Sequence, residues 1–394
     1  MSQASGLQVP IARTSLTEDE IQSVLAPLRS GWLVQGPQVR EFERLWAAFT
    51  GAPHAIAVTS CTTALHLSLA ALGFGSGDEA IVPAFTWIAT ANVVEHLGGK
   101  VVFCDIDPVT FNLDVAQLEA LITPRTRAIL PVHLFGLAAD MDQLTPLARR
   151  HGLWVVEDAA CGFGARLHGR HVGTLGDTGS FSFHPRKAIT TGEGGMITTT
   201  DDALAEKLRQ LRDHGAAMSD LQRHLGPRPY LLADHPEAGY NQRMTDLQAA
   251  LGVAQMQRAE AIVAERQRLA AVYDAAFAGL GWLRTPTVSA GCEHGYQSYP
   301  CMFDPEGVAA GRIEAVNEAR NAWMEELQRQ GISTRPATHA VHMLTFYREK
   351  YGLRPEAFPG AYAANHCSIS LPLFHGMTEA EQQHVVAAVQ GRAG

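Results

Sequence analysis

The spacing of apolar residues along the chain predicts first helices, then strands alternating with helices. Between Ile21 and Leu28 apolar positions recur at helical spacing. This helix is predicted to begin at Thr17, where Thr-Glu-Asp-Glu forms a capping box, and to end at Gly31. A second helix is predicted over residues 39–49.

Between residues 55 and 198, short apolar runs alternate with helical segments. The predicted strands are Ala55–Val58, Ala80–Val82, Val101–Phe103, Ala128–Val132, Leu153–Val156, Ser180–Phe183 and Met196–Thr198. The intervening helices are predicted to begin near Thr62, Trp87, Val115 and Met141. This alternation predicts the α/β fold class, with a mostly parallel central sheet and helices on both faces.

After residue 200 the pattern becomes mainly helical. Helices are predicted over 201–213 and 245–278, on either side of a loop over Leu225–Gly239 that contains glycine and proline. From Trp282 short strands mix with helices at 312–330 and 378–389. We therefore predict a large domain over residues 1–280, including the N-terminal helices, and a smaller α+β domain over 281–394.

Composition excludes several classes of protein. Of the 394 residues 46% are hydrophobic, as in a globular protein, and no apolar run approaches the ~18 residues of a membrane helix. The first residues lack the pattern of a signal peptide. A net charge of -9 argues against nucleic-acid binding, and six scattered cysteines without a CxxC argue against a disulfide or zinc framework. We expect a cytoplasmic protein with no nucleic-acid or membrane partner.

Ser60-Cys61-Thr62-Thr63 joins a predicted strand to a predicted helix. The first turn of a helix offers unpaired amides at the positive end of its dipole, so this junction can hold a phosphate. Simple capping of the helix by serine or threonine is the alternative.

Glu157-Asp158 ends another apolar strand, at the sheet edge where open α/β sheets bind ligands. An aspartate there can pair with a cationic ring nitrogen and keep it protonated. The alternative is an aspartate that caps the following turn.

Lys187 follows the predicted strand at 180–183 and precedes the glycine-rich run Thr190–Gly195, which lets backbone pass close to its surroundings. An enclosed lysine can lose its proton and react with an aldehyde. A solvated surface lysine is the alternative. A phosphate cradle, a carboxylate and a lysine are together the three features needed to hold pyridoxal phosphate (PLP).

The chain resembles the sugar aminotransferases of the DegT/DnrJ/StrS family, which are PLP enzymes of the aspartate aminotransferase fold (fold type I). The motifs that carry the resemblance are Ser30-Gly-Trp-Leu-Val-Gln-Gly-Pro37, Val82-Pro-Ala-Phe-Thr-Trp-Ile-Ala-Thr90, Glu157-Asp-Ala-Ala160, Ser182-Phe-His-Pro-Arg-Lys187, Thr191-Gly-Glu-Gly-Gly195, Gly239-Tyr-Asn-Gln-Arg-Met-Thr-Asp246 and Ser370-Leu-Pro-Leu373. They occur in one order over nearly the whole chain.

The resemblance implies a role for individual residues. Lys187 would bind the cofactor covalently and act in catalysis, and Asp158 would pair with the pyridine nitrogen. Backbone amides near Cys61 and Thr62, with the Ser182 hydroxyl, would hold the phosphate.

Three further residues take roles from the resemblance. Trp87 would stack on the cofactor ring, with a buried core tryptophan as the alternative. Asn241 would reach the phosphate of a neighbouring subunit, which implies a homodimer with shared active sites; a turn residue is the alternative. His342 would contact substrate. A metal site at His339-x-x-His342 is rejected because further ligands are missing.

The chain departs from the family pattern at Cys161, where glutamine or histidine is frequent, and at Leu137, where glutamine is frequent. A thiol is a weak hydrogen-bonding partner for the cofactor's phenolic oxygen. Cys61 and Cys161 are expected to line the cofactor pocket.

The implied reaction moves an amino group, by family expectation from L-glutamate, to a 3-keto or 4-keto group of a nucleotide-linked deoxysugar, in amino-sugar biosynthesis. The leading alternative is an aminotransferase that acts on a cyclitol or another ketone without a nucleotide. A sugar 3-dehydratase would carry histidine in place of Lys187, and a PLP-binding regulator would need a basic DNA-binding segment. A Rossmann dehydrogenase is disfavoured because Gly73-x-Gly75-x-Gly77 has the wrong spacing.

Overall fold

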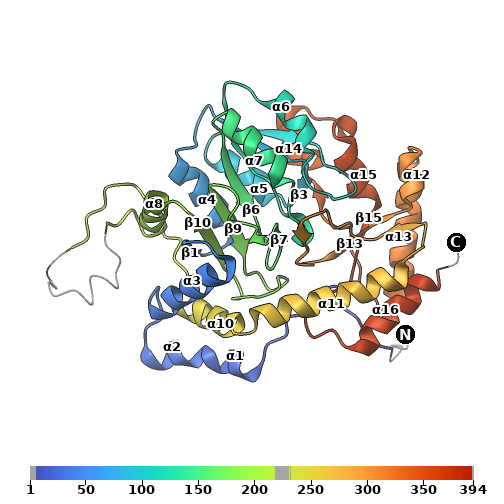
Figure 1. The fold of residues 1–394 in the computed structure, drawn as a ribbon, viewed down its shortest axis with the longest axis horizontal. Helices are drawn as coiled ribbons and strands as arrows, with labels where there is room; N and C mark the ends of the chain where they lie inside the picture. The colour runs from blue at the N-terminus through green and yellow to red at the C-terminus, as the bar shows by residue number, and fades with distance from the viewer. Residues whose placement is uncertain (1–5, 218–229, 231, 393–394) are drawn as a thin grey trace.

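A computed structural model describes residues 6–217, 230 and 232–392 (Figure 1). Every one of the seven strands predicted between residues 55 and 198 is present, and together they form the main sheet in the order β1-β10-β9-β6-β5-β2-β4. The strands are β1 (His54–Val58), β2 (Glu79–Pro83), β4 (Lys100–Cys104), β5 (Thr126–Ile129), β6 (Trp154–Asp158), β9 (Thr178–Ser182) and β10 (Gly195–Thr199).

The sheet is mostly parallel, as predicted. Strands β4, β2, β5, β6 and β9 run parallel to one another, whereas β10 is antiparallel to both of its neighbours. The register pairs Val58 with Gly195, Gly195 with Ser182, and Ser180 with Asp158. The ends of β1, β9 and β6 therefore lie along one edge of the sheet.

Helices cover both faces of the sheet because successive residues of a strand point to opposite faces. In β2, Ala80 and Val82 belong to the core cluster that contains Leu65, whereas Ile81 belongs to the cluster that contains Leu144. The helices of this part are α3 (Pro37–Thr50), α4 (Cys61–Leu72), α5 (Ala89–His96), α6 (Leu118–Leu121), α7 (Met141–Arg150), α8 (Asp202–Arg212), α10 (Asp246–Met256) and α11 (Ala259–Phe277).

Two helices predicted as continuous are each broken in the structure. The N-terminal helix is divided at Val24 into α1 (Glu18–Ser23) and α2 (Leu25–Ser30), ahead of Pro27, although the capping box at Thr17 is confirmed. The helix predicted over 245–278 breaks at residues 257–258 between α10 and α11. In Figure 1, α11 then runs along the molecule toward the C-terminal part.

The C-terminal part contains a three-stranded sheet, β11-β13-β15, and shares its core with the main sheet. Its elements are β11 (Leu283–Arg284), β12 (Cys292–Glu293), β13 (Tyr299–Phe303), α12 (Pro305–Ala309), α13 (Ile313–Arg329), β14 (His339–Ala340), α14 (Thr345–Tyr351), α15 (Pro359–Cys367), β15 (Ser368–Leu371) and α16 (Glu379–Gln390). Strand β14 pairs with β3 (Phe85–Thr86), and a small sheet joins β12 to β7 (Arg166–Leu167) and β8 (Arg170–His171). The division at residue 280 stays a prediction.

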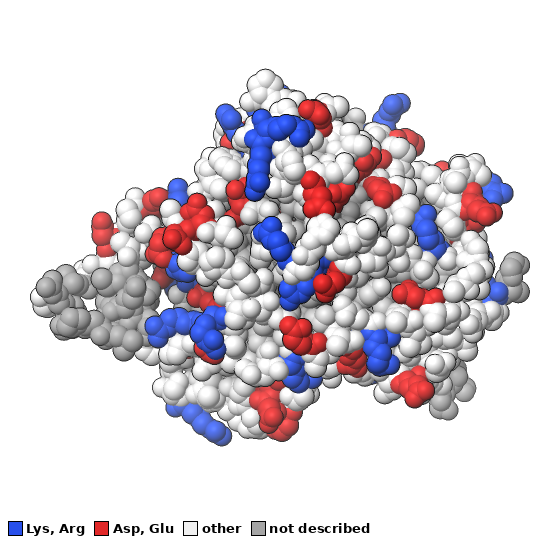
Figure 2. Space-filling model, viewed as in Figure 1, with Lys and Arg blue, Asp and Glu red and all other residues white. Residues whose placement is uncertain are grey.

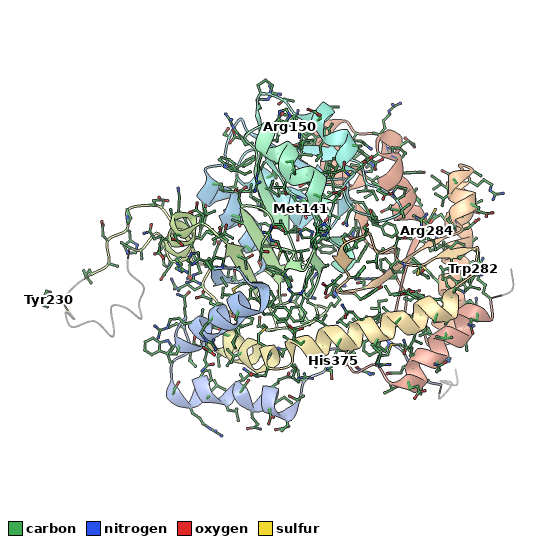
Figure 3. All side chains as sticks on the ribbon, viewed as in Figure 1. Met141, Arg150, Tyr230, Trp282, Arg284 and His375 are labelled. Carbon is green, nitrogen blue, oxygen red and sulfur yellow. The ribbon has the colours of Figure 1, made fainter. Side chains whose placement is uncertain are left out.

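The surface of the described residues carries mixed charge. In the view of Figure 2, acidic and basic side chains are interspersed, without a large field of one sign. None of the helices among the described residues is long and apolar enough to cross a membrane. Residues 225–229 and 231 of the predicted loop lie outside the described residues. Tyr230, labelled in Figure 3, is exposed.

Candidate active site

Three chain segments meet at the sheet edge where β1, β9 and β6 end. Gly195 lies between Val58 and Ser182 in the sheet, directly against the turn that enters α4. A Cβ atom at Gly195 would lie 2.4 Å from the carbonyl carbon of Ser60 and 2.7 Å from the Cys61 nitrogen. The predicted close backbone approach of the glycine run is thus confirmed, and it brings Ser182 next to the start of α4.

The start of α4 leaves two backbone donors open. Ser60 is the N-cap residue, and its Oγ accepts a hydrogen bond from the Thr63 amide at 3.1 Å. The amides of Cys61 and Thr62 precede the first intrahelical bond and have no acceptor among the described residues. Capping and anion binding are therefore compatible here, because the cap occupies Thr63 and leaves the first two amides free.

Asp158 is buried at the end of β6 and only partly hydrogen-bonded. Its Oδ2 lies 2.7 Å from the Thr90 hydroxyl, and its Oδ1 accepts a hydrogen bond from the Ala160 amide at 3.1 Å. One carboxylate oxygen of Asp158, Oδ1, therefore caps the turn that follows β6, as the alternative interpretation predicted. Thr90 is the last residue of the motif Val82–Thr90, from which no role for it is predicted, and its hydroxyl also lies 3.2 Å from the Trp87 carbonyl.

Glu157, the neighbour of Asp158, points to the opposite face of the sheet and is completely buried. Since the Ala139 amide donates to Nδ1 of His133, the His133 proton lies on Nε2 and is donated to Glu157 at 2.7 Å. The amides of residues 173, 175 and 176 also donate to Glu157. Burial raises the pKa of Glu157, but these donors outweigh it and hold the pKa below its ordinary value.

Lys187 approaches the same space from the loop after β9. Its Nζ lies 3.2 Å from the Sγ of Cys161. Cys61 Sγ lies 4.0 Å from Asp158 Oδ1, and its pKa is raised well above the ordinary value by burial and by the Asp158 carboxylate, against the effect of Lys187. Asp158, Lys187 and the two cysteines therefore surround one space, although the side chains come from three different segments.

Trp87 and Ser182 lie at the rim of this space. Trp87 is 55% exposed, so the alternative of a core tryptophan is wrong, and its ring meets that of His339 edge-on at 5.6 Å. Ser182 is half-buried, and the His184 amide lies 3.4 Å from its hydroxyl. Both side chains remain available to a ligand.

The structure places Asn241 beside the site but His342 away from its surface. Asn241 is exposed. The carbonyl of the next residue, Gln242, accepts a hydrogen bond from the Thr59 amide at 3.2 Å, directly before the Ser60 turn that enters α4. His342 is 0% exposed, and its Nε2 lies 2.8 Å from the Pro355 carbonyl. Burial lowers the pKa of His342, and a contact between this buried side chain and substrate stays a prediction. His339 is the histidine at the surface.

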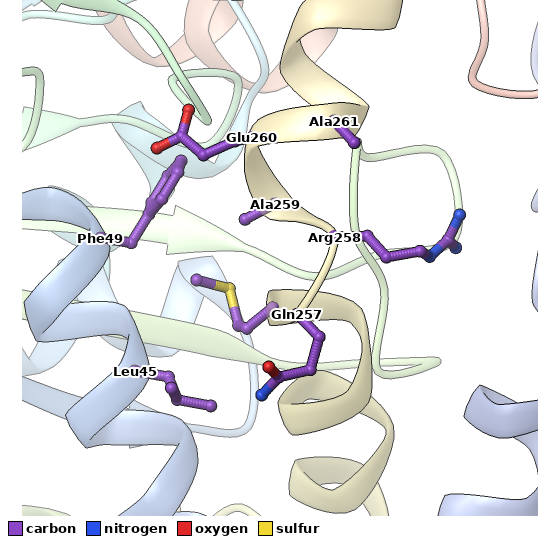
Figure 4. A pocket seen from close by; sticks show the side chains of 8 residues that line it. Leu45, Phe49, Gln257, Arg258, Ala259, Glu260 and Ala261 are labelled. Carbon is purple, nitrogen blue, oxygen red and sulfur yellow. The ribbon is translucent and has the colours of Figure 1, made fainter.

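The described part of the chain holds no cluster of metal ligands, and it has a cavity outside the candidate site. No group of three or more histidine, cysteine, aspartate or glutamate side chains there can hold a metal ion. A separate cavity opens at the break between α10 and α11 (Figure 4). It is lined by Leu45, Phe49, Met256, Gln257, Arg258, Ala259, Glu260 and Ala261, and contains no residue of the predicted site.

The residues at the sheet edge fit PLP. Two open amides at a helix start suit its phosphate, and a buried carboxylate with incomplete hydrogen bonding suits its ring nitrogen. The nearby lysine suits its aldehyde.

Comparisons with known proteins agree with this fit. Residues 14–390 match the model of the DegT/DnrJ/EryC1/StrS aminotransferase family. The chain is 42% identical over 384 residues to GDP-perosamine synthase of Caulobacter vibrioides, with 97% of each chain covered. It is 38% identical over 383 residues to the spore coat polysaccharide biosynthesis protein SpsC of Bacillus subtilis, covering 97% of this chain and 96% of that one. The PLP form of Spr1654 from Streptococcus pneumoniae superposes with a TM-score of 0.87 at 30% identity, covering 96% and 97%.

Proposed function

The chain belongs to the DegT/DnrJ/EryC1/StrS aminotransferase family, and on that premise we propose that it transfers the amino group of L-glutamate to a nucleotide-linked keto-deoxysugar. It is a PLP-dependent aminotransferase of fold type I, and its relatives support a role in amino-sugar biosynthesis. The nucleotide-linked acceptor is supported by the 42% identical GDP-perosamine synthase. The observation that carries the proposal is the meeting of Lys187, Asp158 and the open start of α4 in one space.

The residues of this space would divide the work of the reaction. Bound PLP supplies an aldehyde that takes up the amino group and a ring that accepts the electrons left behind by the departing α-proton. Lys187 would hold the resting cofactor and, once displaced by the donor, move the proton from the donor α-carbon. The Asp158 carboxylate would keep the ring nitrogen protonated, because a negative charge beside a cation favours the charged form.

The remaining residues would bind and orient. The Cys61 and Thr62 amides and the Ser182 hydroxyl would hold the phosphate at the positive end of α4. The exposed Trp87 would cover one face of the ring. Asn241, with no partner for its side chain among the described residues, would reach the phosphate of a second copy, so we propose a homodimer with shared sites.

Cys161 makes this site unusual within the family pattern. Its thiol lies 3.2 Å from the Lys187 amine, where the family often places a stronger hydrogen-bonding side chain. An aminotransferase that acts on a cyclitol or another ketone without a nucleotide keeps every motif and is the second candidate. We further propose that the enzyme is cytoplasmic and that residues 1–280 form the cofactor domain.

The test combines a variant with a substrate panel. Lys187→Ala is expected to lose turnover and the yellow absorption of the lysine-bound cofactor, whereas normal turnover would contradict the assignment. Wild-type enzyme is then supplied with L-glutamate and a panel of nucleotide-linked ketosugars and cyclitol ketones, while 2-oxoglutarate is followed and the amine identified by mass. Amination of cyclitols alone would replace the proposal with the second candidate.

A further inference from the structure

The backbone around Lys187 is held by one side chain from the C-terminal part. Gln297 lies between β12 and β13, and the residue is buried. Its amide oxygen accepts a hydrogen bond from the Ala188 nitrogen at 3.0 Å, and its amide nitrogen donates to the Arg186 carbonyl at 2.7 Å. Only this orientation of the side-chain amide satisfies both groups, because one end accepts and the other donates. Gln297 therefore binds the residues on either side of Lys187.

These two hydrogen bonds restrain the conformation of Lys187 itself. The Arg186 carbonyl belongs to the peptide plane before the Lys187 Cα atom, and the Ala188 nitrogen belongs to the plane after it. Because peptide planes are rigid, only φ and ψ of Lys187 turn the two planes relative to each other. A side chain that holds both planes thus fixes the direction in which the lysine leaves the backbone. That direction places Nζ 3.2 Å from the Cys161 thiol, in the space that contains Asp158.

The backbone of Gln297 is itself fixed by two contacts. Arg266 of α11 is buried and donates from Nη1 to the carbonyls of Tyr296 and Gln297, at 2.9 and 3.2 Å. The Gly295 amide donates to the Gly136 carbonyl at 2.8 Å. Tyr296 has a φ of 45°, in the left-handed region that residues other than glycine seldom adopt. Strained backbone persists only where its surroundings impose it, and it is found most often at functional sites, so this turn suggests a function for the residue that follows it.

A second glutamine holds the same loop in a different way. Gln255 of α10 is buried, accepts a hydrogen bond from the Thr190 amide at 2.9 Å and donates to the Thr190 carbonyl. Both of these groups belong to one residue, which comes three positions after Lys187. Gln255 therefore attaches the loop to α10, whereas Gln297 bonds to both peptide planes that meet at the lysine.

We propose that Gln297 is a positioning residue for Lys187, which directs the lysine side chain so that its amine reaches the cofactor and the donor α-carbon. The inference rests on the proposed function for the role of Lys187. A lysine amine sits on a flexible stem of four carbons, so its reach depends on where the backbone end of the stem is held. Misplacement of a reacting group by about 1 Å can lower a rate about 10²-fold. Gln297 also lines a small cavity with Arg186 and Arg335, so direct binding of a ligand is the role that the experiment must separate from positioning.

The experiment uses the holoenzyme and a single turnover with L-glutamate, followed as the loss of the yellow absorption, so that no acceptor is needed. Gln297→Met keeps nearly the same length and removes both hydrogen bonds. It is expected to lower the rate constant at saturating L-glutamate about 10- to 100-fold, while the half-saturating concentration changes less than about twofold. Gln297→Asn keeps the amide on a shorter stem, cannot reach both groups and should have an intermediate effect. Hydrogen exchange measured by mass spectrometry should become faster in the peptide that contains Ala188, whose amide loses its acceptor.

Gln255→Met is the matched control, because it removes two hydrogen bonds from the same loop without affecting those beside Lys187. It should lower the melting temperature as Gln297→Met does but change the rate constant much less. An equal loss of rate in the two variants would overturn the inference, as would a wild-type rate in a folded Gln297→Met enzyme. A rise in the half-saturating concentration without a loss of rate would also overturn it and would assign Gln297 to ligand binding.

Borohydride reduction of the holoenzyme, followed by peptide mapping, separates this inference from the proposed function. Cofactor fixed to a residue other than Lys187 would refute the proposed role of Lys187 and the inference with it. Cofactor fixed to Lys187 in a Gln297→Met enzyme of wild-type rate would refute the positioning role alone. If wild type reacts with L-glutamate but aminates none of the ketosugars, the proposed acceptor fails, and a loss of rate in Gln297→Met still supports the positioning role.

Discussion

Glu157 and Asp158 are adjacent carboxylates on β6, yet they occupy two different environments. Glu157 is buried behind the sheet with four donors, His133 and three loop amides, around its two oxygens. Asp158 is buried on the other face and has the Thr90 hydroxyl and one amide, with the weakly interacting Cys61 thiol at 4.0 Å.

This difference shows how one strand end serves both stability and chemistry. A buried carboxylate whose hydrogen bonds are complete holds its surroundings in place and has nothing left to offer a ligand. A buried carboxylate with unfilled acceptor positions is costly until a ligand fills them. We therefore expect Glu157 to act in the scaffold and Asp158 in the proposed site, and the variants below test that separation.

Removal of the Glu157 carboxylate should have the largest effect, and the effect should be on stability. Glu157→Ala leaves His133 and three amides without their acceptor and is expected to lower the free energy of unfolding by about 3–5 kcal/mol. Denaturant unfolding followed by circular dichroism measures this loss. Glu157→Gln, which keeps the shape and one acceptor, should lose less. A stable Glu157→Ala enzyme with poor turnover would reverse the assignment of the two carboxylates.

Asp158→Asn should affect activity instead. Loss of the negative charge at the proposed position of the ring nitrogen is expected to lower kcat/KM about 10²–10³-fold, with little change in melting temperature. Asp177 is the matched control, since it accepts a hydrogen bond from the Val155 amide at 2.7 Å at the opposite end of the same strand. Equal losses of activity in Asp158→Asn and Asp177→Asn would mean that the effect is structural.

The pH dependence of stability should come from His171, which lies on the same side of the sheet as Glu157. Burial lowers the pKa of His171, behind the sheet, to about 4. Between pH 6.5 and pH 4 the unfolded chain binds the proton and the folded chain does not, so the free energy of unfolding should fall as pH falls, by roughly 3 kcal/mol in total. His171→Gln should flatten this dependence in unfolding curves measured at several pH values. An equal slope in the variant would assign the dependence to other groups.

Thr90→Val should give the smallest effect of the series. It removes the hydroxyl at 2.7 Å from Asp158 and keeps the shape of the side chain. The loss of one hydrogen bond to a charged group is expected to lower kcat/KM about tenfold. Stability should be nearly unchanged. If Thr90→Val and Asp158→Asn were additive rather than overlapping in a double-mutant cycle, Thr90 would not act through Asp158.

The strands and the strand-end residues were predictable because both depend on local sequence. Buried strands appear as short apolar runs, and Asp158 and Lys187 come two and four residues after such runs. The break at Val24 was missed because the apolar spacing continues across it. Helices α14 and α15 were missed because they are short and begin without a side-chain cap.

Residues that act across long sequence separations could not be found in the same way. Arg335 lies 149 positions after Arg186 and carries no motif of its own, so only the fold reveals the cavity that the two arginines line. His342 shows the same limit from the other side. Its position in the chain predicts a substrate contact, but packing decides exposure, and its side chain is buried against the Pro355 carbonyl.

The close contact between Gly195 and the Ser60 turn also limits how this protein can evolve. Any larger side chain at residue 195 would push the start of α4 away from Ser182, so we expect no substitution of Gly195 to be tolerated. New acceptor preferences must arise in segments that do not bear on this contact. The enzyme can therefore exchange one sugar for another over generations while the geometry around its cofactor stays fixed.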